Sequence, residues 1–294
     1  MGVLCRNVTN QGRWIAVPEL PDILVLARSM DQTLAGQTIA DVTVNQPRCL
    51  DRSPDEFRQA VVGRTFRRCW QRGKWALADL DQDWTLALNL GMGGEVRLHG
   101  LEEAADPERE KVAFRLAGGQ QLWIHFWWFG SVHLAPLGNL AGHPQIGSLG
   151  PEPLADDFTP ERLAEMLRGR RGAVKKYLLD QKFVAGIGNV YVQDILWRAF
   201  IHPLRPTSTL DASAVAQLHR AIQQVLREGI RWGGGPGEQD VWGNKGHYHE
   251  HFEVGYQTGK PCPLCGTAVE EVRVGSTTSY VCPHCQAWPK SGDG

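Results

Sequence analysis

The amino-acid sequence predicts an α+β protein with a strand-rich N-terminal part, a helical middle part and a small cysteine-rich C-terminal unit. Three observations lead to this prediction. Short runs of β-branched and aromatic residues, separated by Gly and Asp turns, continue to about Pro136. Apolar residues at helical spacing replace them after Pro153. Two Cys-x-x-Cys pairs follow at 262–265 and 282–285.

The N-terminal part begins with a helix and continues with strands. Helical spacing relates the apolar residues after Pro18: Ile23, Leu26, Ala27, Met30 and Leu34. Pro21 suits a first helical turn, and Gly36 is a typical stop. Five segments then read as strands: 38–44, 65–80, 84–92, 111–116 and 121–134. We expect a β-sandwich or a barrel-like arrangement that ends near Gly147–Pro153.

The middle part is predicted to be helical. The expected helices are 159–168, with Thr159 as its cap, 174–181, 191–199 and 210–230. The turn Val184–Asn189 contains two glycines and opens onto a helix N-terminus, where backbone amides favour an anion. Residues 233–260 are rich in Gly and His and are expected to form a mobile loop.

Composition gives no overall sign of nucleic-acid binding, because the 294-residue chain has a formal net charge of -1. Residues 161–206 nevertheless carry nine Arg or Lys against four Asp or Glu. The most apolar stretch, 122–137, is too short and too interrupted to cross a bilayer. Residues 1–17 lack the continuous apolar core of a secretory signal. We expect a cytoplasmic monomer that does not interact with membranes.

The four C-terminal cysteines have the spacing of a closed zinc site. Cys262 and Cys265 form one Cys-x-x-Cys pair, Cys282 and Cys285 form the other, and sixteen residues lie between the pairs. Each pair would supply two thiolates to one tetrahedron with no open position, so the metal would be a single structural zinc. A redox Cys-x-x-Cys is the alternative, but it does not explain two matched pairs.

Pro18 carries chemistry only if its nitrogen is free. A proline at the start of a chain is a secondary amine, which can attack a sugar carbon and form an iminium. Val17 precedes it, and GTG encodes valine inside a gene but also serves as a bacterial start codon. Our hypothesis is that Val17 is the true start and that removal of the initiator exposes Pro18. The alternative is a proline-flanked helix cap with a solvated Glu19.

Several motifs, in this order, resemble the formamidopyrimidine-DNA glycosylase and endonuclease VIII family. They are Pro18-Glu19-Leu20-Pro21, Lys74 in a strand, 89–94 (NLGMGG), 149–154 (LGPEPL), 186–191 (GIGNVY), 201–203 (IHP) and the cysteine quartet. The resemblance covers nearly all of residues 18–286. It implies an N-terminal β-sandwich (18–150), a helix-two-turn-helix domain (151–232) and a zinc finger (261–286). An extension (1–17), the mobile loop (233–260) and a tail (287–294) complete the chain.

The resemblance also implies residue roles in a bifunctional DNA glycosylase and abasic-site lyase. Pro18 would be the nucleophile at C1′ of a damaged nucleotide in double-stranded DNA, and Glu19 the proton shuttle. Lys74 and Asn189 would hold phosphates, with Lys175 near the same backbone. Met92 would fill the space of the extruded base. The structural alternatives are a solvated strand charge for Lys74, a core position for Met92 and a helix cap for Asn189.

The sequence departs from the family at the segment 125–130 (HFWWFG), where arginines usually read the orphaned base and bind phosphate. Trp127 and Trp128, followed by Phe129, could stack on bases or could cover a sheet. Because adjacent strand residues face opposite ways, we expect only one of the two tryptophans to face DNA. Thr277 and Thr278 stand in the region of the zinc-hairpin arginine, and Asp22 replaces a usual Glu. A second metal site is a further hypothesis, with the alternating His247, His249 and His251 as its ligands.

Two other classes of protein remain as alternatives. A non-catalytic DNA-binding protein could keep the fold with its proline blocked by an N-terminal extension. A zinc ribbon of an unrelated nucleic-acid enzyme would explain the cysteines, but it would not explain the Pro18 motif or Asn189. The sequence does not identify the lesion or the preferred opposite base.

Overall fold

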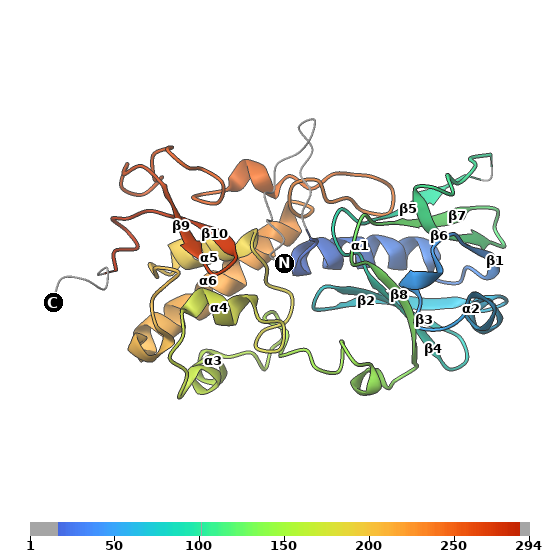
Figure 1. The fold of residues 1–294 in the computed structure, drawn as a ribbon, viewed down its shortest axis with the longest axis horizontal. Helices are drawn as coiled ribbons and strands as arrows, with labels where there is room; N and C mark the ends of the chain where they lie inside the picture. Colours follow the sequence, from blue (N-terminus) through green and yellow to red (C-terminus); the bar gives the residue numbers. More distant parts are fainter. Residues whose placement is uncertain (1–16, 101, 289–294) are drawn as a thin grey trace. The chain divides into compact units, whose positions relative to one another are not determined.

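Figure 1 shows the computed structural model, which describes residues 17–100 and 102–288. The described residues form two compact units. The sandwich unit comprises residues 17–148 and 230–247, and the helical unit comprises residues 149–229 and 248–288. Most of the expected N-terminal extension (1–16) and of the expected tail (289–294) lies outside the described residues.

The sandwich unit contains two four-stranded sheets in which all paired strands are antiparallel. The order of the first sheet is β1-β6-β7-β5 and that of the second is β2-β3-β4-β8. The strands of the first sheet are β1 Ile39–Val44, β6 Glu110–Leu116, β7 Gln121–His125 and β5 Glu95–His99. Those of the second are β2 Phe66–Arg72, β3 Trp75–Leu80, β4 Trp84–Asn89 and β8 Ser131–Pro136.

One hydrophobic core joins the two sheets. Phe114 and Ile124 from the first sheet and Phe66 and Leu86 from the second are all fully buried in it. Helix α1 (Leu20–Leu34) adds its apolar face, including Met30, as its helical spacing predicts. The two separate sheets confirm the sandwich rather than the barrel-like arrangement.

Local signals explain where the sequence-based element bounds were wrong. The segments 65–80 and 121–134 each hold two strands, because Gly73 (φ 56°) and Phe129 (φ 61°) turn the chain. Helix α2 (Pro54–Val61) was not expected, although Ser53 and Glu56 form a capping box at its start. Strand β5 was also missed.

The helical unit contains the expected helices and the cysteine hairpin. The helices are α3 Pro160–Leu167, α4 Val174–Leu179, α5 Tyr191–Arg198 and α6 Ala212–Arg231. The Thr159 hydroxyl accepts from the Arg162 amide (3.2 Å), which confirms the predicted cap. Strands β9 Glu270–Val274 and β10 Thr277–Val281 form a hairpin. Short 3₁₀ turns lie at Thr207–Thr209 and Tyr248–His251 in this unit and at Pro47–Cys49 and Leu140–Gly142 in the sandwich unit.

The segment expected to be a mobile loop, 233–260, is divided between the units after residue 247. Its first part is hydrogen-bonded to the sandwich unit: the Val241 amide donates to Ser29 Oγ (3.1 Å) and its carbonyl accepts from the Leu98 amide (3.0 Å). Its mobility stays a prediction. Within the described parts of the chain, no helix is long and apolar enough to cross a membrane.

Candidate functional site

Pro18 and Glu19 lie at the N-terminus of α1. Glu19 is the N-cap residue and is only 2% exposed, and Pro18 is buried. The Glu19 amide donates to Asp22 Oδ2 (2.6 Å), and the Glu19 carboxylate accepts from the amide of Asp22 in return. This capping box confirms that Glu19 caps the helix, but the carboxylate is not solvated. Pro18 and Glu19 therefore lie beside the positive end of the helix dipole.

Asp22 also connects α1 to residues 233–246. Its Oδ1 accepts from the Gly235 amide (2.7 Å) while Oδ2 remains on Glu19. A glutamate would place its oxygens one methylene farther from the helix, so the shorter side chain suits this double contact. The departure at position 22 thus has a structural explanation.

A third carboxyl group, Glu238, belongs to this acidic cluster. It is 9% exposed. Burial, followed by the charges of Asp22, Glu19 and Glu95, raises the pKa of Glu238 well above its usual value. The same surroundings favour the uncharged form of its carboxyl group. Glu238 could not be predicted, because a lone glutamate in a glycine-rich segment gives no local signal.

The loop between β4 and β5 is paired with the loop between β7 and β8. The Met92 amide donates to the Trp128 carbonyl (2.9 Å), and the Trp127 amide donates to the Met92 carbonyl (3.0 Å). Gly91 makes this approach possible, because a Cβ there would lie 2.1 Å from the Trp128 carbonyl oxygen. Met92 is half-buried. The predicted wedge residue and the aromatic residues are therefore held side by side.

We define the aromatic loop as Trp127, Trp128 and Phe129, which are 50%, 57% and 77% exposed. The three residues lie in a turn after β7 rather than in a strand, so the expectation that only one tryptophan faces DNA loses its basis in strand alternation. Trp127 is nevertheless half buried and lies edge-on to His125 of β7 (ring centroids 5.1 Å), so it covers part of the sheet as well as facing solvent. The loop presents three aromatic rings on a hydrogen-bonded backbone.

Lys74 lies in the two-residue turn between β2 and β3, not in a strand as expected. Gly73 adopts φ 56°, which closes this turn. Asn89 joins the turn to the next loop: its Nδ2 donates to the Lys74 carbonyl (3.5 Å) and its Oδ1 accepts from the Gly91 amide (3.0 Å). The Lys74 side chain is half-buried. Asn89 thus connects the backbone of Lys74 to the next loop, and the Lys74 side chain is partly exposed.

In the helical unit, Asn189 precedes α5 and is half-buried. Its Oδ1 and its carbonyl both accept from Gln193 Nε2 (3.1 and 2.8 Å). The preceding turn is held by Gln181, whose side chain bonds the Gly186 amide (2.8 Å) and the Ile187 carbonyl (2.8 Å). Asn189 therefore stands on a backbone that side chains of the same unit fix in place.

Lys175 is completely buried. Its ammonium group donates to the Thr278 carbonyl (2.8 Å) and to Ser279 Oγ (2.7 Å) in β10. These contacts attach the cysteine hairpin to α4. The DNA-binding role expected for Lys175 stays a prediction, and the structure gives the residue a different contact.

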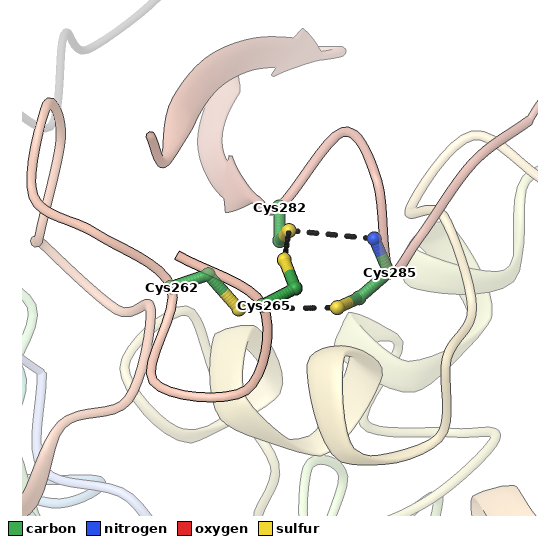
Figure 2. Close-up of side chains that lie close together, drawn as sticks. All are labelled: Cys262, Cys265, Cys282 and Cys285. Atoms are coloured by element: carbon green, nitrogen blue, oxygen red, sulfur yellow. Dashed lines mark hydrogen bonds between the residues drawn. The ribbon is translucent and has the colours of Figure 1, made fainter. Parts of the chain in front are cut away.

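The four cysteines converge as their spacing predicts (Figure 2). Their sulfur atoms all lie within 4.8 Å of one another; Cys262 and Cys285 are 3.9 Å apart, and Cys265 and Cys282 are 3.4 Å apart. A tetrahedral zinc with bonds of about 2.3 Å requires sulfur separations of about 3.8 Å, so the four thiols fit the ion. The distances are too long for disulfides.

Helix α5 contacts the metal site through Trp197, whose Nε1 donates a hydrogen bond to Cys262 Sγ (3.4 Å). The histidines do not form a second site: among residues 17–100 and 102–288, the cysteine quartet is the only group of three or more ligands close enough to share an ion. His247 also belongs to a different unit from His249 and His251.

Comparison with protein families gives three matches. The formamidopyrimidine-DNA glycosylase N-terminal domain matches residues 17–126, and the H2TH domain of that glycosylase matches residues 149–239. The zinc finger found in FPG and IleRS matches residues 259–287. Together with the cysteine cluster, this last match identifies one structural zinc.

Individual relatives agree with the families. The formamidopyrimidine-DNA glycosylase of Chloroflexus aurantiacus is 40% identical over 274 residues, which cover 92% of this chain and 98% of the relative. That of Chloroflexus aggregans is 42% identical over 278 residues, with the same coverage. The solved structure of Lactococcus lactis Fpg with abasic-site DNA superposes with a TM-score of 0.86 at 29% identity, over 92% of this chain and 100% of the other. Its complex with Fapy-dG DNA gives 0.85, with the same identity and coverage.

Proposed function

Because the chain belongs to the formamidopyrimidine-DNA glycosylase family, we propose that Pro18 is its catalytic nucleophile. The protein is a DNA repair glycosylase and abasic-site lyase whose substrate is double-stranded DNA with a damaged or modified base. The alternative of a non-catalytic DNA-binding protein is not favoured, since the relatives are named as glycosylases. The observation that carries the proposal is the place of Pro18, directly before the N-cap of α1.

The chemistry needs a free amine. The Pro18 nitrogen attacks C1′, the bond from C1′ to the base breaks, and the base leaves with the electron pair and takes up a proton. Opening of the sugar then gives an iminium between Pro18 and C1′. The iminium acidifies the C2′ proton, whose removal expels the 3′ phosphate, and a second elimination expels the 5′ phosphate. An amide bond to Val17 would remove the nucleophilic electron pair, so the active protein must begin at Pro18.

Glu19 is placed to deliver a proton to the ring oxygen as the sugar opens. It is adjacent to Pro18 in sequence and buried, and the capping box with Asp22 orients its carboxyl group. Burial and the charges of Asp22 and Glu19 raise the pKa of Glu238 and so favour fewer negative charges in the cluster. A full set of ionised carboxylates there would repel the DNA phosphates.

The remaining residues bind DNA in this proposal. Lys74 in the sandwich unit and Asn189 in the helical unit contact phosphates, each from a turn that hydrogen bonds hold in place. Met92 enters the space of the extruded nucleotide, beside the aromatic loop to which it is paired.

The aromatic loop takes the place of the usual arginines and contacts bases by stacking. A tryptophan has one N–H donor and no charge, whereas stacking is available to every base. We propose that this protein discriminates weakly between bases opposite the lesion. Excision measured on duplexes with each of the four opposite bases should therefore give similar rates, and a preference of 100-fold or more for one base would contradict this part of the proposal.

The catalytic proposal is tested with chains that differ only at the N-terminus. A protein that begins at Pro18 should excise bases from a panel of modified duplexes, and one that keeps Val17 should not. Pro18→Gly in the processed form should retain part of the activity through its primary amine. Equal activity with and without Val17 would exclude Pro18 as the nucleophile. We further propose that the protein acts as a monomer on the nucleoid in the bacterial cytoplasm, where its substrate lies.

A further inference from the structure

Gln193 connects Asn189 to the zinc hairpin. It lies on α5, is 1% exposed and belongs to the helical unit, as do all its partners. Its Nε2 donates to the carbonyl and to Oδ1 of Asn189 and to the Thr278 carbonyl (2.8, 3.1 and 3.2 Å). Its Oε1 accepts from the Tyr280 amide (3.1 Å). One buried carboxamide therefore forms hydrogen bonds both to Asn189 and to strand β10.

The bond to Oδ1 fixes the direction of the Asn189 amide. Nitrogen and oxygen lie on opposite sides of a carboxamide, so with Oδ1 on Gln193, Nδ2 points away from Gln193. A phosphate oxygen accepts from Nδ2 but is repelled by Oδ1. Without the contact to Gln193, the amide of Asn189 could rotate by half a turn and present the wrong atom.

The same carboxamide is attached to β10. Thr278 and Tyr280 stand four and two residues before the metal ligand Cys282. Lys175 binds the same part of the strand through Thr278 and Ser279. The zinc-dependent fold of the hairpin thus determines where the partners of Gln193 lie.

We propose that Gln193 is a positioning residue that orients Asn189 for a DNA phosphate and makes this orientation depend on the zinc hairpin. The inference rests on the phosphate-binding role proposed for Asn189. In this proposal Gln193 touches no reacting atom, so its effect appears in DNA binding, and the part that acts through Asn189 disappears when the Asn189 side chain is removed.

The test is a double-mutant cycle on the affinity for an abasic-site duplex, measured with the zinc-loaded full protein. Gln193→Met keeps the length of the side chain and removes its hydrogen bonds. We expect it to weaken binding about three- to tenfold, the effect of one typical hydrogen bond. In an Asn189→Ala background the same substitution should change the affinity less than twofold.

Gln286→Met is the matched control. Gln286 is also a fully buried carboxamide attached to the hairpin, since its Oε1 accepts from the Cys282 amide (3.0 Å) and its Nε2 donates to the Ile201 carbonyl (2.9 Å). It makes no hydrogen bond to Asn189 in the described structure. Any loss of DNA affinity caused by Gln286→Met should be the same with and without the Asn189 side chain.

Gln193→Glu provides a second variant if Gln193→Met unfolds. It keeps the acceptor for the Tyr280 amide and removes only the donors to Asn189 and Thr278. A carboxylate would attract Asn189 Nδ2 and turn Oδ1 toward the phosphate, so binding should weaken at least as much as with Met. Equal losses for Gln193 variants with and without Asn189 would overturn the inference. Unchanged affinity of Asn189→Ala would overturn it together with the phosphate role, whereas base excision and lyase activity would test the proposed function separately.

Discussion

Replacing one tryptophan of the aromatic loop by alanine should weaken binding of lesion-containing duplex DNA. Trp127 and Trp128 are held by the backbone pairing with Met92, and both rings are at least half exposed. A rigid, exposed ring can stack on a base without first being ordered, so removing it loses contact area rather than fold stability.

The magnitude follows from the exposed area. A tryptophan buries up to about 250 Å². At Trp127, where half is exposed, complete covering of about 125 Å² would contribute about 3 kcal/mol at about 25 cal/mol per Å². A base covers one face of the ring, which leaves about 1.5 kcal/mol, within the range of about 1–3 kcal/mol for stacking on one base. We therefore expect the dissociation constant to rise about tenfold for either tryptophan.

The assay is fluorescence anisotropy of a labelled lesion duplex at several salt concentrations. The loss caused by Trp127→Ala or Trp128→Ala should be nearly independent of salt, because stacking releases no counterions. Lys74→Ala should instead lower the slope of log affinity against log salt by about one. Leu137→Ala is the control, since Leu137 is 46% exposed in the same unit but lies outside the aromatic loop.

Trp127→Phe should restore most of the affinity, because a phenyl ring also stacks. If both alanine variants bind as tightly as the parent protein and only lower its melting temperature, the aromatic loop does not contact bases. A loss that vanishes at high salt would equally refute stacking as the cause.

Three further predictions concern other parts of the molecule. Glu19→Gln should reduce excision of a damaged base much more than cleavage of a preformed abasic site, and equal reductions would contradict its role in sugar opening. Trp197→Phe removes the donor to a metal ligand, so zinc affinity measured by competition with a chelator should fall about 10- to 100-fold. His133 and His143 share a hydrogen bond (3.1 Å), and burial lowers the pKa of both. Because burial disfavours the charged imidazoles in the folded state, the unfolded state binds more protons below its pKa of about 6.5. The contribution of the two histidines to the free energy of unfolding should therefore be fully present above about pH 6.5 and decline as the pH falls below it. The double His→Gln variant should lose this part of the decline.

Local sequence signals predicted much of the fold. The apolar spacing and Pro21 located α1, and Thr159 located the start of α3, because these features act through neighbouring residues. The cysteine spacing predicted the metal site, since each Cys-x-x-Cys pair places two thiolates on one turn. Such signals depend on a few consecutive residues and do not require contacts with distant parts of the chain.

Contacts between distant residues could not be predicted. Gln193 and Glu238 acquire their importance from partners far along the chain, and no spacing marks either position. Lys175 was expected near the DNA backbone from the family resemblance, and its burial against the hairpin depends on residues about a hundred positions away. Trp127 and Trp128 were expected to alternate because the run of apolar residues hid the turn after β7. These differences arise from tertiary packing.

Reductive trapping tests the central claim most directly, because borohydride converts only an iminium into a stable protein–DNA cross-link. The protein that begins at Pro18 and the chain that retains Val17 are incubated with abasic-site duplex and borohydride, and the cross-linked peptide is identified by mass spectrometry. We expect a cross-link at the Pro18 nitrogen in the first protein and none in the second. Equal trapping of both chains, or a cross-link on a lysine such as Lys74, would contradict it.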